Sequence, residues 1–407
     1  MKKYNPEEAI VSVRREFGEH GGVTPSIERS STFTVLDPAM MTQIFQGKKS
    51  PEEGDFFLYS RNFNPTVNVL CRYLAAMEGS ESAIATASGI SAIACTLLQL
   101  CHRGDHIIAS HQIYGGTHAL LENIFPTMDI EVTFVHPTDL DAIKAAIRPK
   151  TRVIYTETMG NPLLTIANIP ALAKIAHQSH DAIRLVVDNT FTPMLISPIA
   201  LGADIVVHSM TKFINGASDI VAGAICASKN FIYQLMDLQE GRLMLLGPTI
   251  DPRVAFDVIQ RLPHLGLRMR EHSVRAMAIA ERLQALGVKV QYPGLPSHPE
   301  HILFKSMLNE NYGFGGMLTI DCGTRERAEK LLSVLQNEEK FGLIAVSLGY
   351  FDTLMSCSGS STSSEISNEE QTQMGLSPGL VRLAIGYTGS LAARLDQITR
   401  AIKKVFT

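Results

Sequence analysis

The sequence predicts an α/β protein with a large domain built on a mainly parallel sheet and a smaller C-terminal α/β domain. Two observations support this prediction. From about residue 65 to residue 250, short apolar runs typical of strands alternate strictly with segments of helical spacing. Beyond residue 250 the strands become fewer and the helical stretches longer. Strict alternation indicates βαβ units, in which helices cover both faces of a parallel sheet.

The elements of the large domain follow one another in pairs. Strands are expected at 82–88, 105–111, 131–136, 151–158, 184–190 and 203–210. Helices are expected around and between them at 66–78, 89–101, 116–125, 139–147 and 169–178. Apolar runs with β-branched residues mark the strands, and apolar residues three and four positions apart mark the helices.

Outside the large domain, the pattern of expected helices and strands is different. A long helical stretch is expected over 252–287, and strands are expected at 315–322 and 379–387. Residues 1–64 and the Ser-rich segment 356–370 show little periodicity, so we expect an arm and a loop there. The predicted units are therefore an arm at 1–64, a large domain at 65–250 and a C-terminal domain at 251–407.

Composition excludes several classes of function. The 407 residues carry a formal net charge of −4 and no long basic run, so neither nucleic acid nor an anionic membrane is expected as a partner. No segment is long and apolar enough for a membrane span, and the first residues lack the apolar core of a signal peptide, so a cytoplasmic protein is expected. The six cysteines are scattered without C-x-x-C pairs, which predicts reduced core thiols and no metal site.

The segment SMTKFINGASD, residues 209–219, places a lysine where a strand ends. Residues 203–210 form a largely apolar run, so Lys212 is expected at a buried strand end rather than on a polar helix face. Two functions are open to such a lysine. It can pair with a carboxylate, or it can form a Schiff base with a carbonyl compound through an amine of lowered pKa.

Other strands also end in polar residues, where ligands bind in sheets of this kind. These residues are Ser88 and Gly89, Tyr114, Glu157 and Asn161, and Asp188. Gly89 opens a helix whose N–H groups can hold an anion, although a simple capped turn is an alternative. Asp188 can equally be a helix cap, and Tyr114 an interface aromatic. Neither G-x-G-x-x-G nor G-x-x-x-x-G-K-[ST] occurs, so dinucleotide and P-loop sites are not expected.

Together these groups match the needs of one ligand. Pyridoxal phosphate requires a Schiff-base lysine, a carboxylate for its pyridine nitrogen, a cup for its phosphate and a flat group over its ring. The residues that supply them, in that order, are Lys212, Asp188, Gly89 with Ser209 and Thr211, and Tyr114. The carboxylate keeps the pyridine nitrogen protonated, and the protonated ring accepts the electrons left when a Cα–H bond breaks.

Eight motifs carry a resemblance to a known family. They are YSRNFNPT (59–66), ASGISAI (87–93), YGGT (114–117), ETMGNP (157–162), VVDNTF (186–191), HSMTK (208–212), VSLG (346–349) and GLVRLAIG (379–386). In the same order, they resemble the motifs of the cysteine and methionine metabolism family of pyridoxal-phosphate enzymes. The resemblance extends over nearly the whole chain.

The resemblance implies an aspartate-aminotransferase-like fold and pyridoxal 5'-phosphate as the cofactor. It implies that Lys212 holds the cofactor and later moves protons. The residues that it implies for cofactor binding are Lys212, Asp188, Ser88, Gly89, Ile90, Tyr114, Asn161, Ser209 and Thr211, joined by Tyr59 and Arg61 from the neighbouring subunit. The large domain would bind the cofactor, and the N-terminal arm would contribute to the neighbouring subunit. The active unit would be a dimer, and the usual assembly a homotetramer.

For the substrate, the resemblance implies that Arg382 takes the α-carboxylate, helped by Ser347 and Asn161. A surface salt bridge is the alternative role for Arg382, but its place inside an apolar strand argues against it. Tyr114 would be the acid for the leaving sulfur. Hydrolysis after elimination would give a 2-oxo acid and ammonia.

The motifs define the cofactor better than the sulfur amino acid. Position 116 is glycine, as in the synthases and cystathionine lyases of the family, and a missing side chain there is expected to widen the pocket. Residues 347–365 are most similar to the methionine γ-lyases of plants, and Leu354 and Met355 are candidate contacts for a thioether. We expect methionine γ-elimination. The alternatives are a cystathionine γ- or β-lyase, an O-acetylhomoserine sulfhydrylase and a cystathionine γ-synthase.

Overall fold

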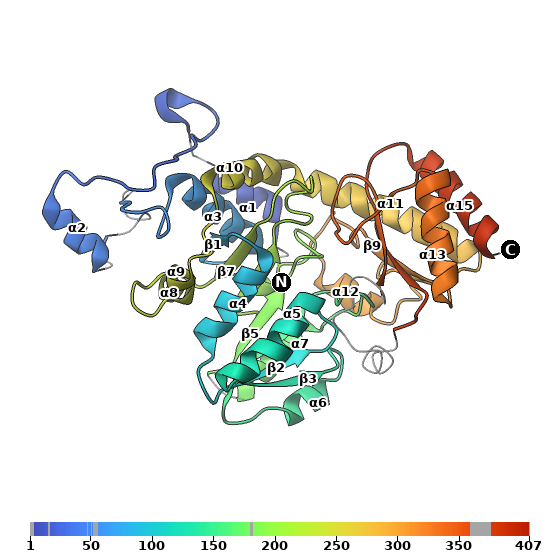
Figure 1. Cartoon of the computed structure of the whole chain (residues 1–407), viewed down its shortest axis with the longest axis horizontal. Helices are drawn as coiled ribbons and strands as arrows, with labels where there is room; N and C mark the ends of the chain where they lie inside the picture. Colours follow the sequence, from blue (N-terminus) through green and yellow to red (C-terminus); the bar gives the residue numbers. More distant parts are fainter. Residues whose placement is uncertain are drawn as a thin grey trace.

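Two sheets organise the chain. The computed structural model describes residues 4–14, 17–46, 48–49, 51, 56–179, 182–358 and 376–406. The larger sheet uses strands between residues 82 and 227, and the smaller one uses strands between residues 290 and 384. Figure 1 shows the smaller sheet and its helices at the right of the larger one. The predicted fold class, a mainly parallel α/β unit with a smaller C-terminal α/β unit, is confirmed.

Within the described residues the large sheet has the strand order β1, β7, β6, β5, β4, β2, β3. The bounds are β1 Ser82–Thr86, β2 His106–Ser110, β3 Glu131–Val135, β4 Thr151–Glu157, β5 Arg184–Asp188, β6 Ile205–Ser209 and β7 Gly223–Ala227. Neighbours are parallel except at β7, which is antiparallel to both β1 and β6. The sequence pattern does not predict β7, because its residues GAICA include a single β-branched side chain.

Helices cover both faces of this sheet. They are α3 Pro65–Glu78, α4 Gly89–Leu100, α5 Gly115–Ala119, α6 Leu140–Ala145, α7 Ile169–Ser179, α8 Lys229–Leu235 and α9 Arg242–Leu246. The single helix predicted at 116–125 is wrong in its length. There α5 gives way to a π-helical turn at Leu120–Ile124 and a 3-10 turn at Phe125–Met128. Pro126 lacks the N–H group that a continuing α-helix requires.

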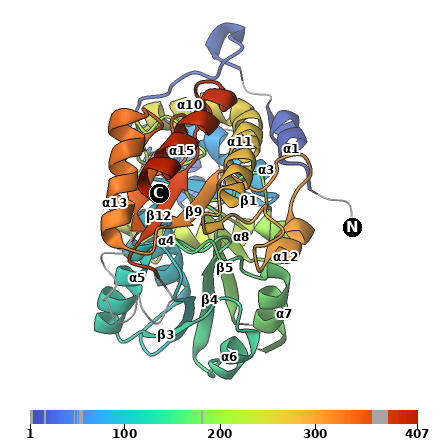
Figure 2. The ribbon, with the colours of Figure 1, turned by 90° about the vertical axis from the view of Figure 1, so that its right-hand side faces the viewer.

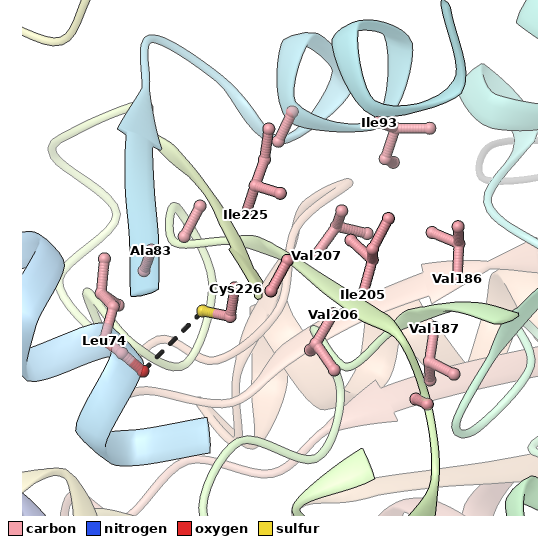
Figure 3. Close-up of a cluster of buried hydrophobic side chains, with 14 of the residues drawn as sticks. Leu74, Ala83, Ile93, Val186, Val187, Ile205, Val206, Val207, Ile225 and Cys226 are labelled. Atoms are coloured by element: carbon pink, nitrogen blue, oxygen red, sulfur yellow. Dashed lines mark hydrogen bonds between the residues drawn. The ribbon is translucent and has the colours of Figure 1, made fainter. Parts of the chain in front are cut away.

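The core of the large unit lies between α3, the sheet and α4 (Figure 3). Neighbouring residues of β7 point to opposite faces, as the pleat requires. Ile225 lies toward α4, whereas Cys226 lies toward α3 and donates from Sγ to the carbonyl oxygen of Leu74 at 3.8 Å (Figure 3). All six cysteines are free and buried, in agreement with the predicted core thiols.

The smaller sheet has the order β10, β11, β12, β9, β8 within the described residues, and only the β10–β11 pair is parallel. The bounds are β8 Val290–Gln291, β9 Met317–Asp321, β10 Leu343–Ile344, β11 Leu354–Cys357 and β12 Leu380–Ala384. β9 and β12 are the two predicted strands. Ser356 and Cys357 belong to β11 rather than to the loop predicted at 356–370. Most of that loop, from residue 359, lies outside the described residues.

Within the described residues, the α-helices of this unit are α10 Pro252–Arg261, α11 Leu265–Ala285, α12 His301–Met307, α13 Arg325–Ser333 and α15 Leu391–Phe406. α11, α13 and α15 lie over the smaller sheet (Figure 2). The helix predicted over 252–287 is interrupted by a 3-10 turn at Leu262–His264, because Pro263 cannot continue the ladder of hydrogen bonds. Among the helices of the described ranges, none combines the length and the apolar composition that a membrane span needs.

The N-terminal region contains two short helices that the sequence pattern does not show, α1 Pro6–Val13 and α2 Pro38–Phe45. Both begin with an Asn or Asp cap followed by proline, a local signal for a helix start. α1 packs on α3, and its Glu7 pairs with Arg270 of α11 at 3.0 Å. α2 lies away from the body of the chain, at the left of Figure 1. The predicted domain bounds, 1–64, 65–250 and 251–407, stay predictions.

Candidate functional site

A cavity of about 380 Å³ opens at the carboxyl ends of β4, β5 and β6. It brings together most of the predicted site residues, which are Ser88, Gly89, Ile90, Tyr114, Asn161, Asp188, Ser209, Thr211, Lys212 and Arg382. Its lining also includes Glu157, Thr190 and an apolar wall of Ile93, Met159, Phe191, Val221, Val346 and Leu348. The cavity therefore combines ionisable groups with an apolar surface large enough to contact a small organic ligand.

Lys212 lies in the turn after β6 and points its amine at the smaller unit. Nζ donates to Oγ of Ser347 at 3.0 Å, so its hydrogen-bond partner is a hydroxyl group. Burial, and next the positive charge of Arg382, lower the pKa of Lys212 to about 8. A lowered pKa leaves more of the amine neutral near physiological pH, and the neutral amine is the form that attacks a carbonyl carbon.

Asp188 is the last residue of β5, which pairs with β6, the strand that precedes Lys212. Its Oδ1 accepts from the N–H of Thr190 at 2.9 Å, and its Oδ2 accepts from the hydroxyl of Tyr155 at 3.5 Å. Burial raises the pKa of Asp188, while the Thr190 bonds and the nearby ring of His208 act in the opposite direction. A buried carboxylate of this kind is well suited to a cationic partner inside the cavity.

The N-terminus of α4 forms a cradle against the end of β6. Ser88 caps the helix and accepts from the N–H of Ser91 at 3.2 Å. A Cβ added at Gly89 would lie 2.6 Å from Cβ of Ser209, so only glycine allows this approach of the two backbones. The N–H groups of the first helical turn have no partner inside the helix and carry the positive end of its dipole. With the hydroxyl groups of Ser209 and Thr211, they form a site suited to a phosphate.

Arg382 reaches the cavity from β12 of the smaller sheet. It is 4% exposed, which excludes the alternative role in a surface salt bridge. Nη1 donates to Oδ1 of Asn161 at 2.8 Å, and Nη2 donates to the carbonyl oxygen of Ser347 at 3.3 Å. Burial lowers the pKa of Arg382 to about 10, yet the group remains a cation at neutral pH. Ser347 is thereby in contact with both Lys212 and Arg382.

Glu157 has a structural task that the sequence does not predict. The sequence shows only that it lies at the end of a strand. Oε1 accepts from the backbone N–H of Tyr114 at 2.6 Å, and Oε2 accepts from that of Asn161 at 3.2 Å. One carboxylate thus ties together two loops that carry predicted site residues. Burial, followed by the charge of Asp188, raises the pKa of Glu157 well above its usual range. The strand-end position was the available signal, but the role depends on backbone contacts that sequence does not reveal.

Gly116 does not enlarge the cavity in the way that the sequence suggests. A Cβ at this position would lie 2.6 Å from Cε1 of Tyr114, so the tyrosine ring already occupies the space. Half of the Tyr114 surface is exposed. The pocket is therefore not widened at Gly116 while the Tyr114 ring holds this position. A side chain at 116 would instead push Tyr114 out of its position.

Two predicted cofactor residues lie apart from the others. Tyr59 and Arg61 line a second cavity, of about 710 Å³, between the N-terminal region and α8. Arg61 donates from Nη1 to the carbonyl oxygen of Met244 at 2.9 Å, and its guanidinium lies 5.7 Å from the ring centre of Tyr59. Within one chain, therefore, neither residue is among the described groups that line the Lys212 cavity.

The expected thioether contacts, Leu354 and Met355, are also absent from the lining of the Lys212 cavity as far as the structure describes it. Both are buried in hydrophobic clusters on β11. That expectation is wrong, because residues of a paired inner strand pack into the core on either face. Val346 and Leu348, which flank Ser347, provide the apolar wall instead.

The sequence as a whole identifies the family. A family model described as Cys/Met metabolism PLP-dependent enzyme matches residues 8–394. The chain belongs to this family. The resemblance seen in the eight motifs is thereby confirmed.

Individual members of the family are similar over almost their full length. A methionine gamma-lyase of Arabidopsis thaliana is 53% identical over 403 residues, which are 98% of this chain and 91% of that protein. A cystathionine beta-lyase of Lactococcus lactis subsp. cremoris is 37% identical over 95% of this chain and 97% of that one. Among solved structures, a cystathionine gamma-lyase from Lactobacillus plantarum complexed with L-serine superposes with a TM-score of 0.86 at 28% identity, covering 98% of this chain and 99% of that one.

Pyridoxal phosphate is the cofactor of the Cys/Met metabolism family, and the cavity fits it chemically. It offers an amine of lowered pKa, a buried carboxylate and a helix N-terminus whose first residue must be glycine. These are the groups that an aldehyde, a pyridine nitrogen and a phosphate require. The chain is accordingly a pyridoxal-phosphate-dependent enzyme of cysteine and methionine metabolism.

Proposed function

We propose that the protein is a methionine γ-lyase, which converts L-methionine and water to methanethiol, 2-oxobutanoate and ammonia. The observation that carries this proposal is the 53% identity to the Arabidopsis methionine gamma-lyase across almost the whole chain. The cavity supports it: the wall around Val346 and Leu348 is apolar, as a methyl thioether would require. The reaction is redox neutral and needs no further co-reactant.

Each polar group of the cavity has a proposed task. Bound pyridoxal phosphate would act as an electron sink for the substrate carbon that loses its hydrogen. Lys212 would hold the cofactor through its amine and would take the α-proton of the substrate. Asp188 holds the pyridine nitrogen in its protonated form. Arg382 binds the substrate carboxylate through two N–H groups, with Asn161 fixing the guanidinium.

The remaining predicted residues complete the site. Tyr114 donates the proton that the leaving sulfur needs, and its backbone is held by Glu157. Ser347 helps to bind the substrate carboxylate, because its hydroxyl is free to turn once Lys212 moves away. The cofactor phosphate is held by Ser88, Gly89, Ile90, Ser209 and Thr211.

A cystathionine lyase is the second candidate, favoured by the 37% identity to a cystathionine beta-lyase. We expect catalytic efficiency to be higher for methionine than for cystathionine. The four charged groups of the described cavity lining, Lys212, Arg382, Asp188 and Glu157, all have other tasks, so none is left to bind the distal amino-acid end of cystathionine. The measurement is kcat/KM for methionine, cystathionine and cysteine, with product identification, and with O-acetylhomoserine plus sulfide as a test for a synthase or sulfhydrylase. A tenfold preference for cystathionine, equivalent to about 1.4 kcal/mol in transition-state binding, would replace the assignment by cystathionine lyase.

We also propose that two subunits share each active site, in a dimer that pairs into a homotetramer. Tyr59 and Arg61 support this, because they lie outside the Lys212 cavity of their own chain and Tyr59 is 46% exposed. From the neighbouring subunit they would complete the phosphate cup, since an Arg fork suits a phosphate. The cytoplasmic location expected from the sequence remains part of the proposal.

Mixed dimers test the sharing. Arg61→Ala and Lys212→Ala subunits should each be inactive alone, and random mixing should restore up to about a quarter of the wild-type activity, because half of the dimers are mixed and each has one intact site of two. The matched control mixes Asp188→Asn with Lys212→Ala. Those two residues line one cavity of one chain, so this pair should restore nothing. Verified mixed dimers of the first pair without activity would show that the site is not shared.

A further inference from the structure

Two polar side chains on one face of α11 point away from solvent into the junction between the two units. Arg268 and His272 lie four residues apart, so they stand one above the other on the helix. Arg268 is 7% exposed and His272 is fully buried. Neither lines the cofactor cavity, and neither has a role in the proposed reaction.

Arg268 holds the turn that follows the candidate cofactor lysine. Nη1 donates to the carbonyl oxygen of Phe213 at 2.5 Å, and Nη2 donates to that of Ile214 at 2.8 Å. These two residues come directly after Lys212 in the chain. The contact is close: Gly216 has φ +75°, and a Cβ there would lie 2.3 Å from Nη1.

The hydrogen-bond partners of the Arg268 guanidinium among the described residues are neutral. Besides the two carbonyl groups, Nε donates to Nδ1 of His264 at 3.0 Å and Nη2 to the carbonyl oxygen of Arg261 at 3.3 Å. Burial lowers its pKa to about 10, so the group is a buried cation at neutral pH. A buried cation costs more than an apolar side chain of the same volume. Stability alone is therefore a poor reason for an arginine at this position.

His272 holds the end of the strand that carries the candidate carboxylate-binding arginine. Nδ1 donates to the carbonyl oxygen of Ile385 at 2.5 Å, three residues after Arg382. Burial lowers the pKa of His272 to about 4, so the ring is neutral and its single proton lies on Nδ1. The ring also packs edge to face on Phe213 at 5.1 Å and on Tyr387 at 5.0 Å. Phe213 is thus held by Arg268 through its backbone and by His272 through its ring.

We propose that Arg268 and His272 are positioning residues: from one turn of α11 they set the distance between the amine of Lys212 and the guanidinium of Arg382. The proposal rests on the proposed function in that these two groups meet the cofactor and the substrate carboxylate. The substrate's α-hydrogen can reach the lysine only when its carboxylate is held at the right distance. Displacements of about 1 Å can lower a rate by roughly 10²-fold.

The experiment uses the holoenzyme and L-alanine, which has an α-carboxylate and an α-hydrogen but no leaving group. The dissociation constant of alanine, from the change in cofactor absorbance, measures how well Arg382 binds the substrate carboxylate. The rate at which its α-hydrogen exchanges in D₂O at saturating alanine, followed by NMR, measures how well Lys212 removes the α-proton. Arg268→Met should lower the exchange rate tenfold or more with little change in affinity. His272→Leu should weaken affinity tenfold or more with a smaller effect on the rate.

Conservative variants separate positioning from stability. His272→Asn keeps a donor near Nδ1 and should restore affinity, whereas Arg268→Lys can hold only one carbonyl and should restore the exchange rate in part. Arg282→Met, on the same helix, should change neither parameter. The proposal is overturned if both parameters stay within twofold of wild type in the Met and Leu variants, or if both variants change the same parameter equally. Should those variants not fold, an unchanged exchange rate in Arg268→Lys overturns it alone.

These readouts do not depend on which sulfur amino acid the enzyme uses. Failure of methionine turnover with normal alanine exchange would defeat the methionine assignment and leave the positioning role intact. A borohydride label that maps to a lysine other than Lys212 would defeat the proposed cofactor site itself.

Discussion

Lys212→Ala should lower methionine turnover by about 10³-fold or more, because the variant loses both the group that anchors the cofactor and the base that takes the α-proton. The phosphate cradle at α4 does not include the lysine side chain, so the variant should still bind some cofactor non-covalently. The measurements are kcat with methionine and the mapping of borohydride-fixed cofactor by peptide mass. Wild-type protein should carry the label at Lys212.

Lys144→Ala is the matched control, since Lys144 is an exposed lysine on α6 whose amine pairs with Asp141 of the same helix. It should retain wild-type turnover and label. Substantial turnover in Lys212→Ala, or a label at another lysine in wild type, contradicts the assignment.

Asp188→Asn should lower kcat by about 10²-fold or more. The amide keeps the shape and can still accept the bond from Thr190, but it has no charge to hold a protonated pyridine nitrogen. Without that proton, the electrons of the broken Cα–H bond have a weaker sink. Cofactor attachment to Lys212 should persist, so borohydride labelling separates this loss from a loss of cofactor.

Asp188→Glu provides the comparison for the same position. It keeps the charge with a longer side chain, so its kcat should fall less than that of Asp188→Asn. Equal losses in the two variants would indicate that packing, and not charge, is what this residue contributes.

The alternation of strands and helices could be predicted because it depends on local chemistry. The apolar runs at 185–187 and 205–207 are typical of the buried strands β5 and β6, and α4 begins at a serine cap. β7 could not be predicted in the same way: its small residues are compatible with helix or strand, and its antiparallel place between β1 and β6 comes from tertiary pairing. Pro126 and Pro263 lie inside segments of helical spacing, and in both segments the α-helix gives way to a 3-10 turn that contains the proline.

The site residues likewise divide into those that a local sequence pattern reveals and those that depend on tertiary contacts. Lys212, Asp188 and Gly89 could be identified because strand ends converge at one edge of a parallel sheet. The task of Glu157 was missed because it acts on backbone N–H groups of residues 114 and 161. Arg268 and His272 lie on a helix whose pattern is ordinary, and only the packing of α11 against the two units shows what they hold. The role proposed for Tyr59 and Arg61 needs a second subunit, and within one chain the two residues line a different cavity.

The buried cysteines have a chemical consequence if the enzyme releases a thiol, as the proposed reaction requires. The disulfides of methanethiol exchange with protein thiols, and the protein thiolate is the form that attacks them. Burial raises the pKa of Cys71, Cys101 and Cys322 to about 12 and that of Cys95 to about 11, so almost none of these groups is ionised at neutral pH. Cys226 lies on β7 beneath α3 with its sulfur directed at a backbone carbonyl. These five cysteines therefore offer little thiolate to a disulfide of the thiol that the proposed reaction releases, and this resistance to mixed-disulfide formation follows from the packing of the core.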